Sequence, residues 1–400
     1  MHAMKAPHLR KGRERPRHSY FVPVQRGLEP VLVAELEALG LSNLRGVEGG
    51  ASFEGTLEDC YRANLWLRTG ARVLRVVAEF PCADEVALYR EAKQVDWFRL
   101  LDPEQTIAVR ARLGRTRFRD SRYVALKIKD AIVDACREAF GRRPSVDKAA
   151  PGVQVNAWFD QDRCTLSLDS SGEPLFKRGY RRETGEAPLR ENLAAGLIGL
   201  TGWTPGRPFR DPMCGSGTIA IEAALIATHR APGLTRAGFA FERWPDFQRS
   251  LWKRLRAEAE AAVRPPPGGA EIRASDRDPE AVAQARLNAE AAGVADAIRF
   301  DVADFRDTSG QEMGGEPGAP GSGGVLLVNP PYGERIGKGS PLPKLYKDLG
   351  DVLKQRYKGW EAYVFAAHGD LLKSIGLRAS RRTILYNGAL ECRLLQFKLY

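Results

Sequence analysis

The chain has 400 residues, of which 43% are hydrophobic and 28% charged, and it carries a net charge of +11. This length suggests about two or three domains of roughly 100 to 200 residues each, and the composition is typical of a globular protein. Because no stretch approaches the roughly 18 consecutive apolar residues of a membrane helix, we expect no membrane association.

Six cysteines are scattered through the sequence without a CxxC pair, and no apolar segment follows the basic N-terminus. We therefore expect a protein of the reducing cytoplasm, without a secretion signal. The five histidines are dispersed and form no HExxH motif, so we expect no metal site.

The N-terminal part of the chain reads as short strands alternating with amphipathic helices. Residues 20–39 contain a strand, a turn and a helix, and residues 49–69 contain a second strand and helix. We therefore expect an α+β region. Its later elements are a strand at 72–80, a helix at 84–97, a strand at 106–113, a helix at 123–140, and strands at 153–160 and 164–172.

Positive charge is concentrated in two segments. Met1 to His18 carries six Lys or Arg and one Glu, hence +5, and we expect this tail to be disordered. Residues 110–129 hold eight basic residues and one acidic residue, with aromatic residues among them. That pattern is typical of a nucleic-acid surface, although a solvated loop explains it equally well. The candidate RNA-binding residues in this segment are Arg110, Arg112, Arg115, Arg117, Arg119, Arg122 and Lys127.

From about Leu175 onward, apolar strands alternate with helices, which predicts a doubly wound parallel sheet. Asn387-Gly388 lies between two alternating runs and predicts a type I′ hairpin, hence an antiparallel strand pair closing the sheet. The other expected elements are strands at 208–211, 271–276, 297–304, 324–328 and 361–368, and helices at 219–228, 279–293, 345–357 and 370–376.

Two segments of this region look like insertions. Residues 241–262 form a helical arm that ends in a Pro-rich stretch, and residues 309–324 contain nine Gly or Pro in sixteen. We expect the second segment to be mobile.

The carboxyl ends of the parallel strands are where ligands bind in such sheets. Asp211 opens the turn "DPMCGSGT", in which Gly215 and Gly217 allow close approach to the backbone. No GxGxxG or GxxxxGK[ST] motif is present, which argues against nicotinamide or triphosphate nucleotides. Asp276 at the next strand end is suited to ribose hydroxyls and Asp304 to an adenine amino group. The alternative is that each aspartate caps the following helix or turn.

The stretch "VLLVNPPYG" ends a buried strand at Asn329, because Pro330 and Pro331 supply no backbone N–H. An exocyclic base amine is a poor nucleophile, since its lone pair is delocalised into the ring. The Asn329 side-chain oxygen and the Pro330 carbonyl are suited to accept its two hydrogens and to orient the lone pair, while Tyr332 stacks on the base. No general base is then required. The alternative is a Pro-rich strand exit whose tyrosine only packs.

The chain resembles class I S-adenosylmethionine-dependent RNA methyltransferases that carry a THUMP domain, in particular the guanine-N2 methyltransferases of large-subunit ribosomal RNA. The motifs that carry the resemblance are "LFKRGYR", "APLRENLAAGLI", "DPMCGSGT", "NPPYGERIG" and "YNGALECRL". It implies a ferredoxin-like segment at 19–65, a THUMP domain at 66–172 and a Rossmann-like methyltransferase domain at 173–400.

The resemblance implies S-adenosylmethionine as cofactor and N2-methylation of a guanine in 23S ribosomal RNA, either free or in a pre-50S particle. Lys177, Arg178, Arg181 and Arg182 are candidates for guiding RNA across the domain junction, or belong to an exposed linker. The alternatives are a tRNA guanine-N2 methyltransferase, a DNA adenine-N6 methyltransferase and a noncatalytic RNA-binding assembly factor. The expected cofactor-binding residues are Asp211, Met213, Cys214, Gly215, Gly217, Thr218, Asp276, Asp304 and Phe305.

Overall fold

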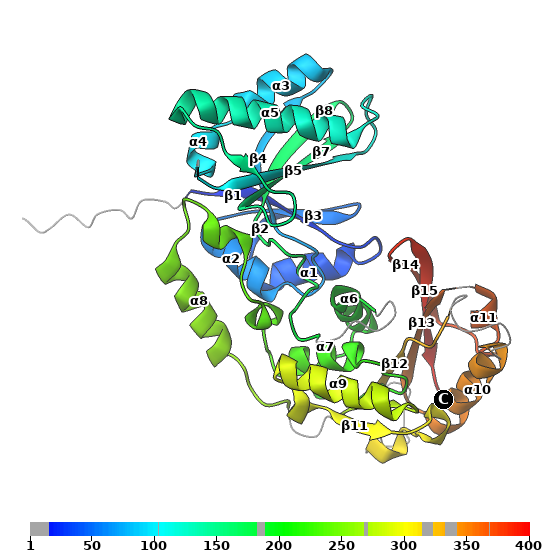
Figure 1. The fold of residues 1–400 in the computed structure, drawn as a ribbon. Coiled ribbons are helices and arrows are strands. Elements are labelled where there is room, and N and C mark those ends of the chain that lie inside the picture. The colour runs from blue at the N-terminus through cyan, green and yellow to red at the C-terminus, as the bar shows by residue number, and fades with distance from the viewer. Residues whose placement is uncertain are drawn as a thin grey trace, which may run out of the picture.

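The computed structural model describes residues 16–102, 104–181, 189–267, 271–313, 323–332, 342–367 and 369–400. The N-terminal half contains one sheet with helices packed on it, and the C-terminal half contains a second sheet (Figure 1). In the described part of the chain, no helix combines the length and the apolar character needed to span a membrane. The first 15 residues of the predicted basic tail lie outside the described residues, and His18 already belongs to the first strand.

The N-terminal half is built on one eight-stranded sheet with the order β2-β3-β1-β4-β8-β7-β5-β6. Antiparallel pairing of Tyr20 with Arg75 joins the strands of the first 55 residues to the later ones. The sheet is therefore continuous across the two predicted α+β units. Its strands are β1 (His18–Pro23), β2 (Ser42–Val47), β3 (Gly50–Gly55), β4 (Leu74–Pro81), β5 (Thr106–Leu113), β6 (Ser145–Val146), β7 (Val153–Asp160) and β8 (Arg163–Asp169).

The sequence did not predict β2 and β6, the two edge strands. Most of their residues are exposed, so they lack the alternating apolar pattern that identifies a half-buried strand. The helix expected at 84–97 is divided into α3 (Glu85–Lys93) and α4 (Trp97–Leu100). The other helices of this half are α1 (Glu29–Ala38), α2 (Leu57–Trp66) and α5 (Ser121–Phe140).

Helix α5 begins two residues before the predicted start because Asp120 caps it. The Asp120 carboxylate accepts from the backbone N–H groups of Arg122 and Tyr123, which satisfies two of the free donors of the first turn. The helix ends at Gly141, which has a φ of 67°. Its buried side chains include Val124 and Ile128, and it packs against β5.

The C-terminal half confirms the predicted doubly wound sheet with a closing antiparallel hairpin. The strand order is β11-β10-β9-β12-β13-β15-β14, so the order reverses between β9 and β12. The first five strands in this order are parallel, and β15 pairs antiparallel with β13 and β14. The strands are β9 (Phe209–Asp211), β10 (Ile272–Asp276), β11 (Arg299–Val302), β12 (Val325–Val328), β13 (Glu361–Ala367), β14 (Arg381–Asn387) and β15 (Leu390–Lys398).

The helices of this half follow the predicted alternation with the strands. The inserted arm is also helical, as predicted, and in Figure 1 its helix runs beside α2. The helices are α6 (Glu191–Thr201), α7 (Thr218–Ala227), α8 (Arg249–Ala261) in the arm, α9 (Pro279–Ala292), α10 (Leu342–Arg356) and α11 (Gly369–Lys373).

Two local predictions in this half were wrong. The hairpin turn is formed by Gly388 and Ala389, because Asn387 still pairs with Leu390. Of the two turn residues only Gly388 has a positive φ, of 65°, so the turn is not type I′, which needs positive φ at both positions. In addition, β11 ends at Val302, so Asp304 lies beyond the strand rather than at its last position.

The Gly- and Pro-rich insertion at 309–324 is anchored at both ends, which corrects the expectation that all of it is mobile. Gln311–Met313 form the 3-10 turn η5, with Met313 buried. A Cβ on Gly324 would lie 2.5 Å from the Trp360 ring, so only glycine fits there. Residues 314–322 lie outside the described residues.

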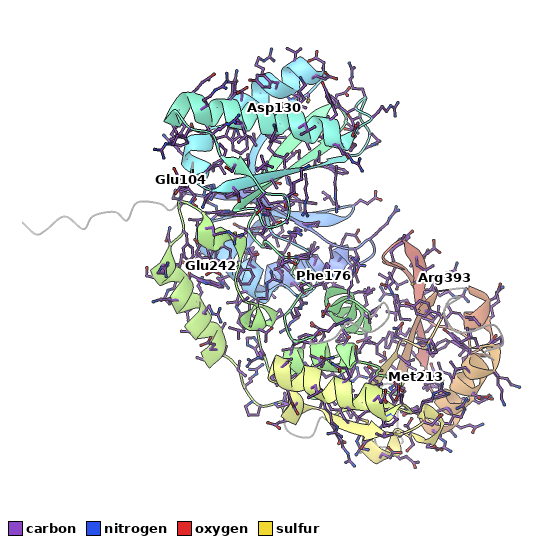
Figure 2. The ribbon with its side chains drawn as sticks, viewed as in Figure 1. Glu104, Asp130, Phe176, Met213, Glu242 and Arg393 are labelled. Atoms are coloured by element: carbon purple, nitrogen blue, oxygen red, sulfur yellow. The ribbon has the colours of Figure 1, made fainter. Side chains whose placement is uncertain are left out.

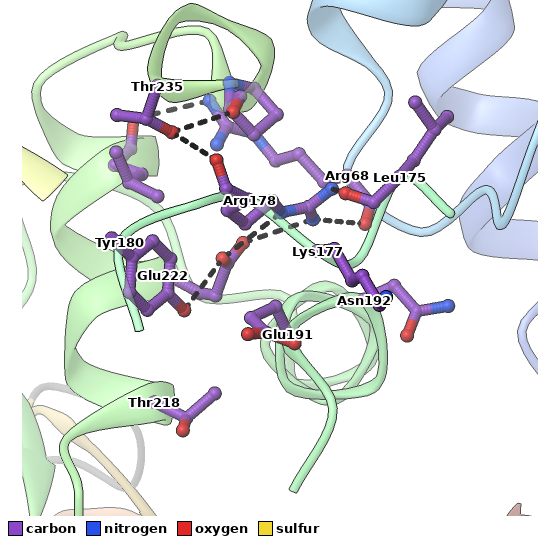
Figure 3. Close-up of polar contacts among 12 residues, drawn as sticks. Arg68, Leu175, Lys177, Arg178, Tyr180, Glu191, Asn192, Thr218, Glu222 and Thr235 are labelled. Atoms are coloured by element: carbon purple, nitrogen blue, oxygen red, sulfur yellow. Dashed lines mark hydrogen bonds and ion pairs between the residues drawn. The ribbon is translucent and has the colours of Figure 1, made fainter. Parts of the chain in front are cut away.

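A buried polar network joins the two halves of the molecule (Figure 3). The Arg178 guanidinium lies 3.4 Å from the Glu222 carboxylate, and the two side chains are 1% and 0% exposed. Arg178 also donates to the carbonyls of Leu175 and Arg68, and Tyr180 donates to Glu222. Because Glu222 belongs to α7 and Arg68 follows α2, the network fixes α7 against the N-terminal half.

We predict that Arg178→Met destabilises the protein by about 3 to 5 kcal/mol, because it leaves the Glu222 carboxylate buried without its cation. Urea unfolding gives the free energy. The matched control is Lys177→Met, which removes only an exposed ion pair with Glu173 and should change stability by about 1 kcal/mol or less. Equal losses in the two variants would contradict the role of the network.

Candidate active site

The candidate site lies where the strand order reverses, at the carboxyl ends of β9, β10 and β12. The turn after β9 is held by backbone hydrogen bonds. The Cys214 N–H donates to the Ser275 carbonyl at 2.9 Å, and the Gly217 N–H donates to the Cys214 carbonyl at 2.8 Å. The Gly215 N–H donates to the Asp276 carboxylate at 3.0 Å. The first and second strands of the crevice are therefore tied together by this turn.

The two glycines of the turn serve different purposes. Gly215 has a φ of 50°, and a Cβ placed on it would meet nothing within 4 Å, which leaves room for a ligand beside the backbone. Gly217 has a φ of 81° and begins α7, and its Cβ would lie 2.9 Å from the Cβ of Ala285. Gly217 is therefore needed for the turn and for packing of α7 against α9, rather than for ligand access.

Asp211 ends β9 with a fully buried carboxyl group. Neither carboxyl oxygen completes a hydrogen bond. The pKa of Asp211 is raised to about 8, chiefly by burial. The Met213 backbone N–H, whose approach falls short of a full hydrogen bond, and Arg210 oppose this rise, and the nearby Asp276 adds to it. An unpaired buried acceptor is unfavourable in the absence of a ligand, so Asp211 is suited to bind a donor or a cation.

The other two aspartates are already engaged in local hydrogen bonds. Asp276 accepts from Gly215 and from the backbone N–H of Asp278. Asp304 caps the 3-10 turn η4 (Phe305–Asp307) by accepting from the backbone N–H of Arg306, and it also pairs with the Arg306 guanidinium. Capping, which the sequence left open, is thus present at Asp304. Asp278 caps α9 as its position before Pro279 suggests.

The remaining candidate cofactor residues lie in or beside the turn. Cys214 is buried, and burial raises the pKa of its thiol, so it stays protonated and is unsuited to be a nucleophile. Met213 is partly buried in the C-terminal half, where Figure 2 labels it. Thr218 is buried at the start of α7, and Phe305 is buried in the core around β12 and β13.

Arg181 was a candidate for guiding RNA, but its side chain is only 12% exposed and it supports the same turn. Its guanidinium donates to the Thr218 hydroxyl at 3.0 Å and lies 3.3 Å from the Glu191 carboxylate at the start of α6. Arg182 lies outside the described residues. Arg181 lies in the motif "LFKRGYR" and Glu191 in "APLREN". The sequence therefore identified both segments but did not show that they contact each other. Figure 2 places Phe176, from the first motif, in the junction between the halves.

The Asn-Pro-Pro-Tyr segment leaves β12 at the opposite wall of the crevice. Asn329 is partly exposed, but its side-chain oxygen is buried and has no hydrogen-bond partner. Pro330 is buried and Pro331 is exposed. The Pro331 carbonyl accepts from Tyr346 at 3.4 Å. The acceptor needed to orient an amine is therefore present and unused, on a segment anchored by its neighbours.

Tyr332 is held by the C-terminal hairpin. Its hydroxyl accepts from the Asn387 side-chain amide at 3.1 Å, and its ring lies edge-to-face with Phe365. Asn387 had been interpreted only as a turn residue, because Asn before Gly is a common turn signal. Its contact with Tyr332 depends on the hairpin lying beside the crevice, which no local pattern reveals.

The predicted RNA-binding residues divide into three groups. Arg110, Arg112, Arg119 and Arg122 are exposed, and Lys127 is half-buried over the Tyr123 ring. Arg115 and Arg117 are exposed but paired with Asp160 and Asp162. Arg178 is 1% exposed, so the prediction that it contacts RNA was wrong; it is a structural residue of the junction.

A pocket of about 480 Å³ lies over β9, β10 and β11, beside residues of this site: Arg210 precedes Asp211, and the Ala303 N–H donates to the Asp276 carbonyl. Its three arginines, Arg210, Arg273 and Arg299, are paired with Glu312, Glu271 and Asp301. The charges of this pocket therefore balance internally. Among the described residues, no group of three or more His, Cys, Asp or Glu is arranged to hold a metal ion. All six cysteines are free and buried.

The strand order, the glycine turn after β9 and the Asn-Pro-Pro-Tyr exit from β12 define a class I methyltransferase fold. Residues 178–396 match the RMKL-like methyltransferase domain, residues 19–74 the RlmL ferredoxin-like domain, and residues 82–169 the THUMP domain. The chain therefore belongs to the RMKL-like methyltransferase family.

Two relatives in sequence cover most of the chain. A Syntrophotalea carbinolica protein named ribosomal RNA large subunit methyltransferase K/L is 43% identical over 388 residues, which is 95% of this chain and 53% of the relative. A Synechocystis protein named as an RNA methyltransferase is 42% identical over 381 residues, or 95% of this chain and 97% of the relative. The chain thus spans about half the length of the K/L relative.

Solved structures share the whole architecture. A methyltransferase crystallised with SAH superimposes with a TM-score of 0.84 at 32% identity, covering 96% of this chain and 99% of that one. A Listeria monocytogenes protein named as an N6-adenine-specific DNA methylase superimposes with a TM-score of 0.84 at 32% identity, covering 96% of this chain and 97% of that one. TrmN from Thermus thermophilus superimposes with a TM-score of 0.69 and covers 96% of this chain and 100% of that one. Because the two sequences are only 21% identical, this similarity shows the fold alone.

We predict that the ligand-free protein loses stability through Asp211 as pH rises from about 4 to about 8. In this window the folded carboxyl keeps its proton while the unfolded one has lost it, so raising the pH favours unfolding. One group contributes up to about 1.4 kcal/mol per pH unit. Denaturant unfolding of the wild type and of Asp211→Asn across this pH range measures the free energy of unfolding at each pH. The free energy of the variant should fall less steeply with pH than that of the wild type. Identical pH dependence in the two proteins would exclude Asp211 as the source of the loss.

We also predict that Tyr332 and Asn387 are energetically coupled. Tyr332→Phe and Asn387→Ala each remove the 3.1 Å hydrogen bond, so each should cost about 1 kcal/mol, and the double variant should cost less than the sum by a similar amount. Unfolding free energies of the four proteins of this cycle measure the coupling. Strict additivity would show that the bond does not fix the ring.

Proposed function

We propose that this protein transfers a methyl group from S-adenosylmethionine to the exocyclic N2 amine of a guanine in large-subunit ribosomal RNA. The observation that carries the proposal is the buried, unpaired side-chain oxygen of Asn329 at the end of β12. It lies on the strand next to β9, whose end carries the equally unpaired carboxyl of Asp211. Two unsatisfied acceptors on adjacent strand ends fit a site that binds two ligands with N–H groups.

The residues around the glycine turn fit S-adenosylmethionine. Asp211 offers a carboxyl group to a cationic or donor group, and the space beside Gly215 admits a ligand against the backbone. Asp276 retains acceptor capacity for ribose hydroxyls, since each carboxylate oxygen has more than one lone pair. The bound cofactor would supply a methyl group on a positively charged sulfur. Arg181 and Asn288 hold the turn through Thr218 and Ser216.

The Asn-Pro-Pro-Tyr segment would prepare the amine. The Asn329 oxygen and the Pro330 carbonyl would accept the two N–H hydrogens, which leaves the nitrogen lone pair directed away from both. Tyr332, fixed by Asn387, would hold the base by stacking. Orientation of two reactants supplies on the order of 7 to 11 kcal/mol in favourable cases, so no general base is required. The surplus proton would leave to water after transfer.

RNA is the favoured substrate over DNA. The same segment suits the N6 amine of adenine, and a similar Listeria structure carries the name of a DNA methylase. However, the chain also contains a THUMP domain at 82–169, and its sequence relatives are named as RNA methyltransferases. A guanine in a duplex has to be unstacked to reach the crevice, so an accessible RNA segment, free or in a pre-50S particle, is proposed. This substrate implies a cytoplasmic protein.

We predict that Asn329→Ala lowers turnover by at least about 100-fold, because it removes a preorganised polar group at the reacting amine. RNA affinity should stay within about twofold, since a single acceptor contributes little to binding a long RNA. Asn329→Asp keeps an acceptor oxygen at this position and should retain more activity than the alanine variant. Labelled methyl transfer to ribosomal RNA, followed by nucleoside digestion, measures both rate and product.

The same assay separates the alternatives. N2-methylguanosine formed in ribosomal RNA would support the proposal. N2-methylguanosine formed only in tRNA would show that tRNA is the substrate. N6-methyladenine formed in DNA would show that both the proposed base and the proposed nucleic acid are wrong. RNA binding without cofactor binding would instead favour a noncatalytic assembly factor. Near-normal turnover of Asn329→Ala would remove that residue from the mechanism.

A further inference from the structure

The Asn-Pro-Pro-Tyr segment after β12 has no backbone N–H at two successive positions, because Pro330 and Pro331 lack it. Only the carbonyls of these two residues can therefore be held by hydrogen bonds. The Pro331 carbonyl accepts from the Tyr346 hydroxyl on α10 at 3.4 Å. The Pro330 carbonyl, which is the proposed acceptor for the amine, has no hydrogen-bond partner within the described part of the chain. Tyr346 thus holds the segment at the residue next to its free acceptor.

Holding the Pro331 carbonyl also restricts the direction of the Pro330 carbonyl. The ring of Pro331 fixes its φ, and the peptide groups on either side are planar, so ψ of Pro331 is the one soft torsion angle between the two carbonyls. The Tyr346 bond limits rotation about this angle. Farther along the segment, Asn387 holds the Tyr332 ring through its hydroxyl. The free acceptor and the ring are thereby set relative to each other.

The Tyr346 hydroxyl is a permanent donor at this position. Its side chain is 0% exposed and lies in the core between α10 and the strands β12 and β13. Burial raises the pKa of the hydroxyl, and the nearby Tyr332 and Cys392 raise it further, so it stays protonated at neutral pH. A buried hydroxyl without a partner is unfavourable, which favours its contact with the Pro331 carbonyl.

Helix α10, which carries Tyr346, is anchored against the turn that follows β11. Asp348 accepts from two nitrogens of the Arg306 guanidinium, both at 3.0 Å. Arg306 also donates to Asp304, whose carboxylate caps that turn. The Tyr346 hydroxyl, two residues before Asp348, is therefore fixed through its helix as well as through its contact with the segment.

The Tyr346 contact is too long to add much stability. At 3.4 Å it exceeds the roughly 2.5–3.0 Å that is usual for an O–H···O bond. Tyr363 provides a comparison, since it is buried too and its hydroxyl lies 3.0 Å from the Thr201 carbonyl and 2.9 Å from the Glu361 carboxylate. What the Tyr346 contact determines is the direction of a carbonyl.

We propose that Tyr346 is a positioning residue for methyl transfer. Its hydroxyl holds the Pro331 carbonyl so that the Pro330 carbonyl and the Tyr332 ring receive the target base in the reactive orientation. This inference rests on the proposed function, in which these two groups accept the amine and stack on the base. Because the Tyr346 side chain is buried and touches neither ligand, its loss should slow the reaction without weakening binding.

Tyr346→Phe removes the hydroxyl and keeps the ring. Methyl transfer from S-adenosylmethionine to ribosomal RNA is measured in single turnovers with both at saturating concentration, which separates the chemical step from product release. The rate should fall about tenfold or more, because a displacement of about 1 Å can cost about 100-fold. The KM for RNA and the Kd for S-adenosylmethionine should stay within about twofold of the wild-type values.

Tyr363→Phe is the matched control. It removes a buried hydroxyl whose contacts are shorter than that of Tyr346, so it should destabilise the protein at least as much. Its single-turnover rate should nevertheless stay within about twofold of wild type. Equal slowing in both variants would assign the effect to a general loss of packing and overturn the positioning role. An unchanged rate in Tyr346→Phe would overturn it as well.

A measurement on the ligand-free protein needs no catalysis. In protein labelled with 3-fluorotyrosine, the fluorine resonance of Tyr332 is identified by its absence in Tyr332→Phe. This resonance should broaden in Tyr346→Phe and keep its wild-type width in Tyr363→Phe, because only the first variant releases the segment that carries the ring. An unchanged width in Tyr346→Phe would overturn the inference.

Failure of this inference and failure of the proposed function give different results. If the wild type methylates another base or nucleic acid and Tyr346→Phe slows that transfer, the positioning role stands and the proposed substrate is wrong. If N2-methylguanosine forms in ribosomal RNA at the same rate with wild type and variant, the proposed function stands and the inference is overturned. If no methyl group is transferred, the proposed function fails, and the width of the Tyr332 resonance decides whether Tyr346 holds the segment.

Discussion

The buried ion pair between Arg178 and Glu222 is the contact on which the relation between the two halves depends. Glu222 lies on α7, the helix that starts at the glycine turn, while Arg178 also bonds the Arg68 carbonyl in the N-terminal half. Removing two charges from water is favourable only when their polar atoms find partners. Here Tyr180 and the Leu175 carbonyl help to complete the set. The network therefore joins α7, which starts at the glycine turn, to the N-terminal half of the molecule.

A second contact constrains the other wall of the crevice. Gln25, after β1, donates to the Tyr386 carbonyl on the C-terminal hairpin, and Gly27 lies so close to Ile384 that a Cβ would be 2.6 Å from its carbonyl oxygen. The next residue of the hairpin, Asn387, holds Tyr332. The N-terminal half thus contacts both α7, which starts at the glycine turn, and the hairpin that holds Tyr332.

The sequence was informative where an apolar strand runs directly into a polar residue. Asp211 and Asn329 were identified because apolar strands run directly into them, and the structure places both at the reversal of strand order. Arg178 was misassigned because its neighbours in "LFKRGYRR" made the segment look like a basic linker, and only tertiary packing shows that its charge is buried. Asn387 was interpreted as a turn residue for the same reason: its partner Tyr332 is 55 positions away in the chain. Local patterns report which face is apolar, but they do not report which polar groups meet.

The unpaired acceptors at Asp211 and Asn329 have a consequence for selectivity on the proposed chemistry. Each lowers the stability of the ligand-free protein, because a buried polar atom without a partner forfeits its hydration. A bound amine that donates two hydrogens satisfies the Asn329 oxygen and the Pro330 carbonyl together. The methylated product has only one hydrogen left on that nitrogen, so it leaves one of the two acceptors unsatisfied, at an estimated cost of about 1 to 3 kcal/mol. The product would then bind less tightly than the substrate, which favours release after one transfer and disfavours a second methylation of the same nitrogen.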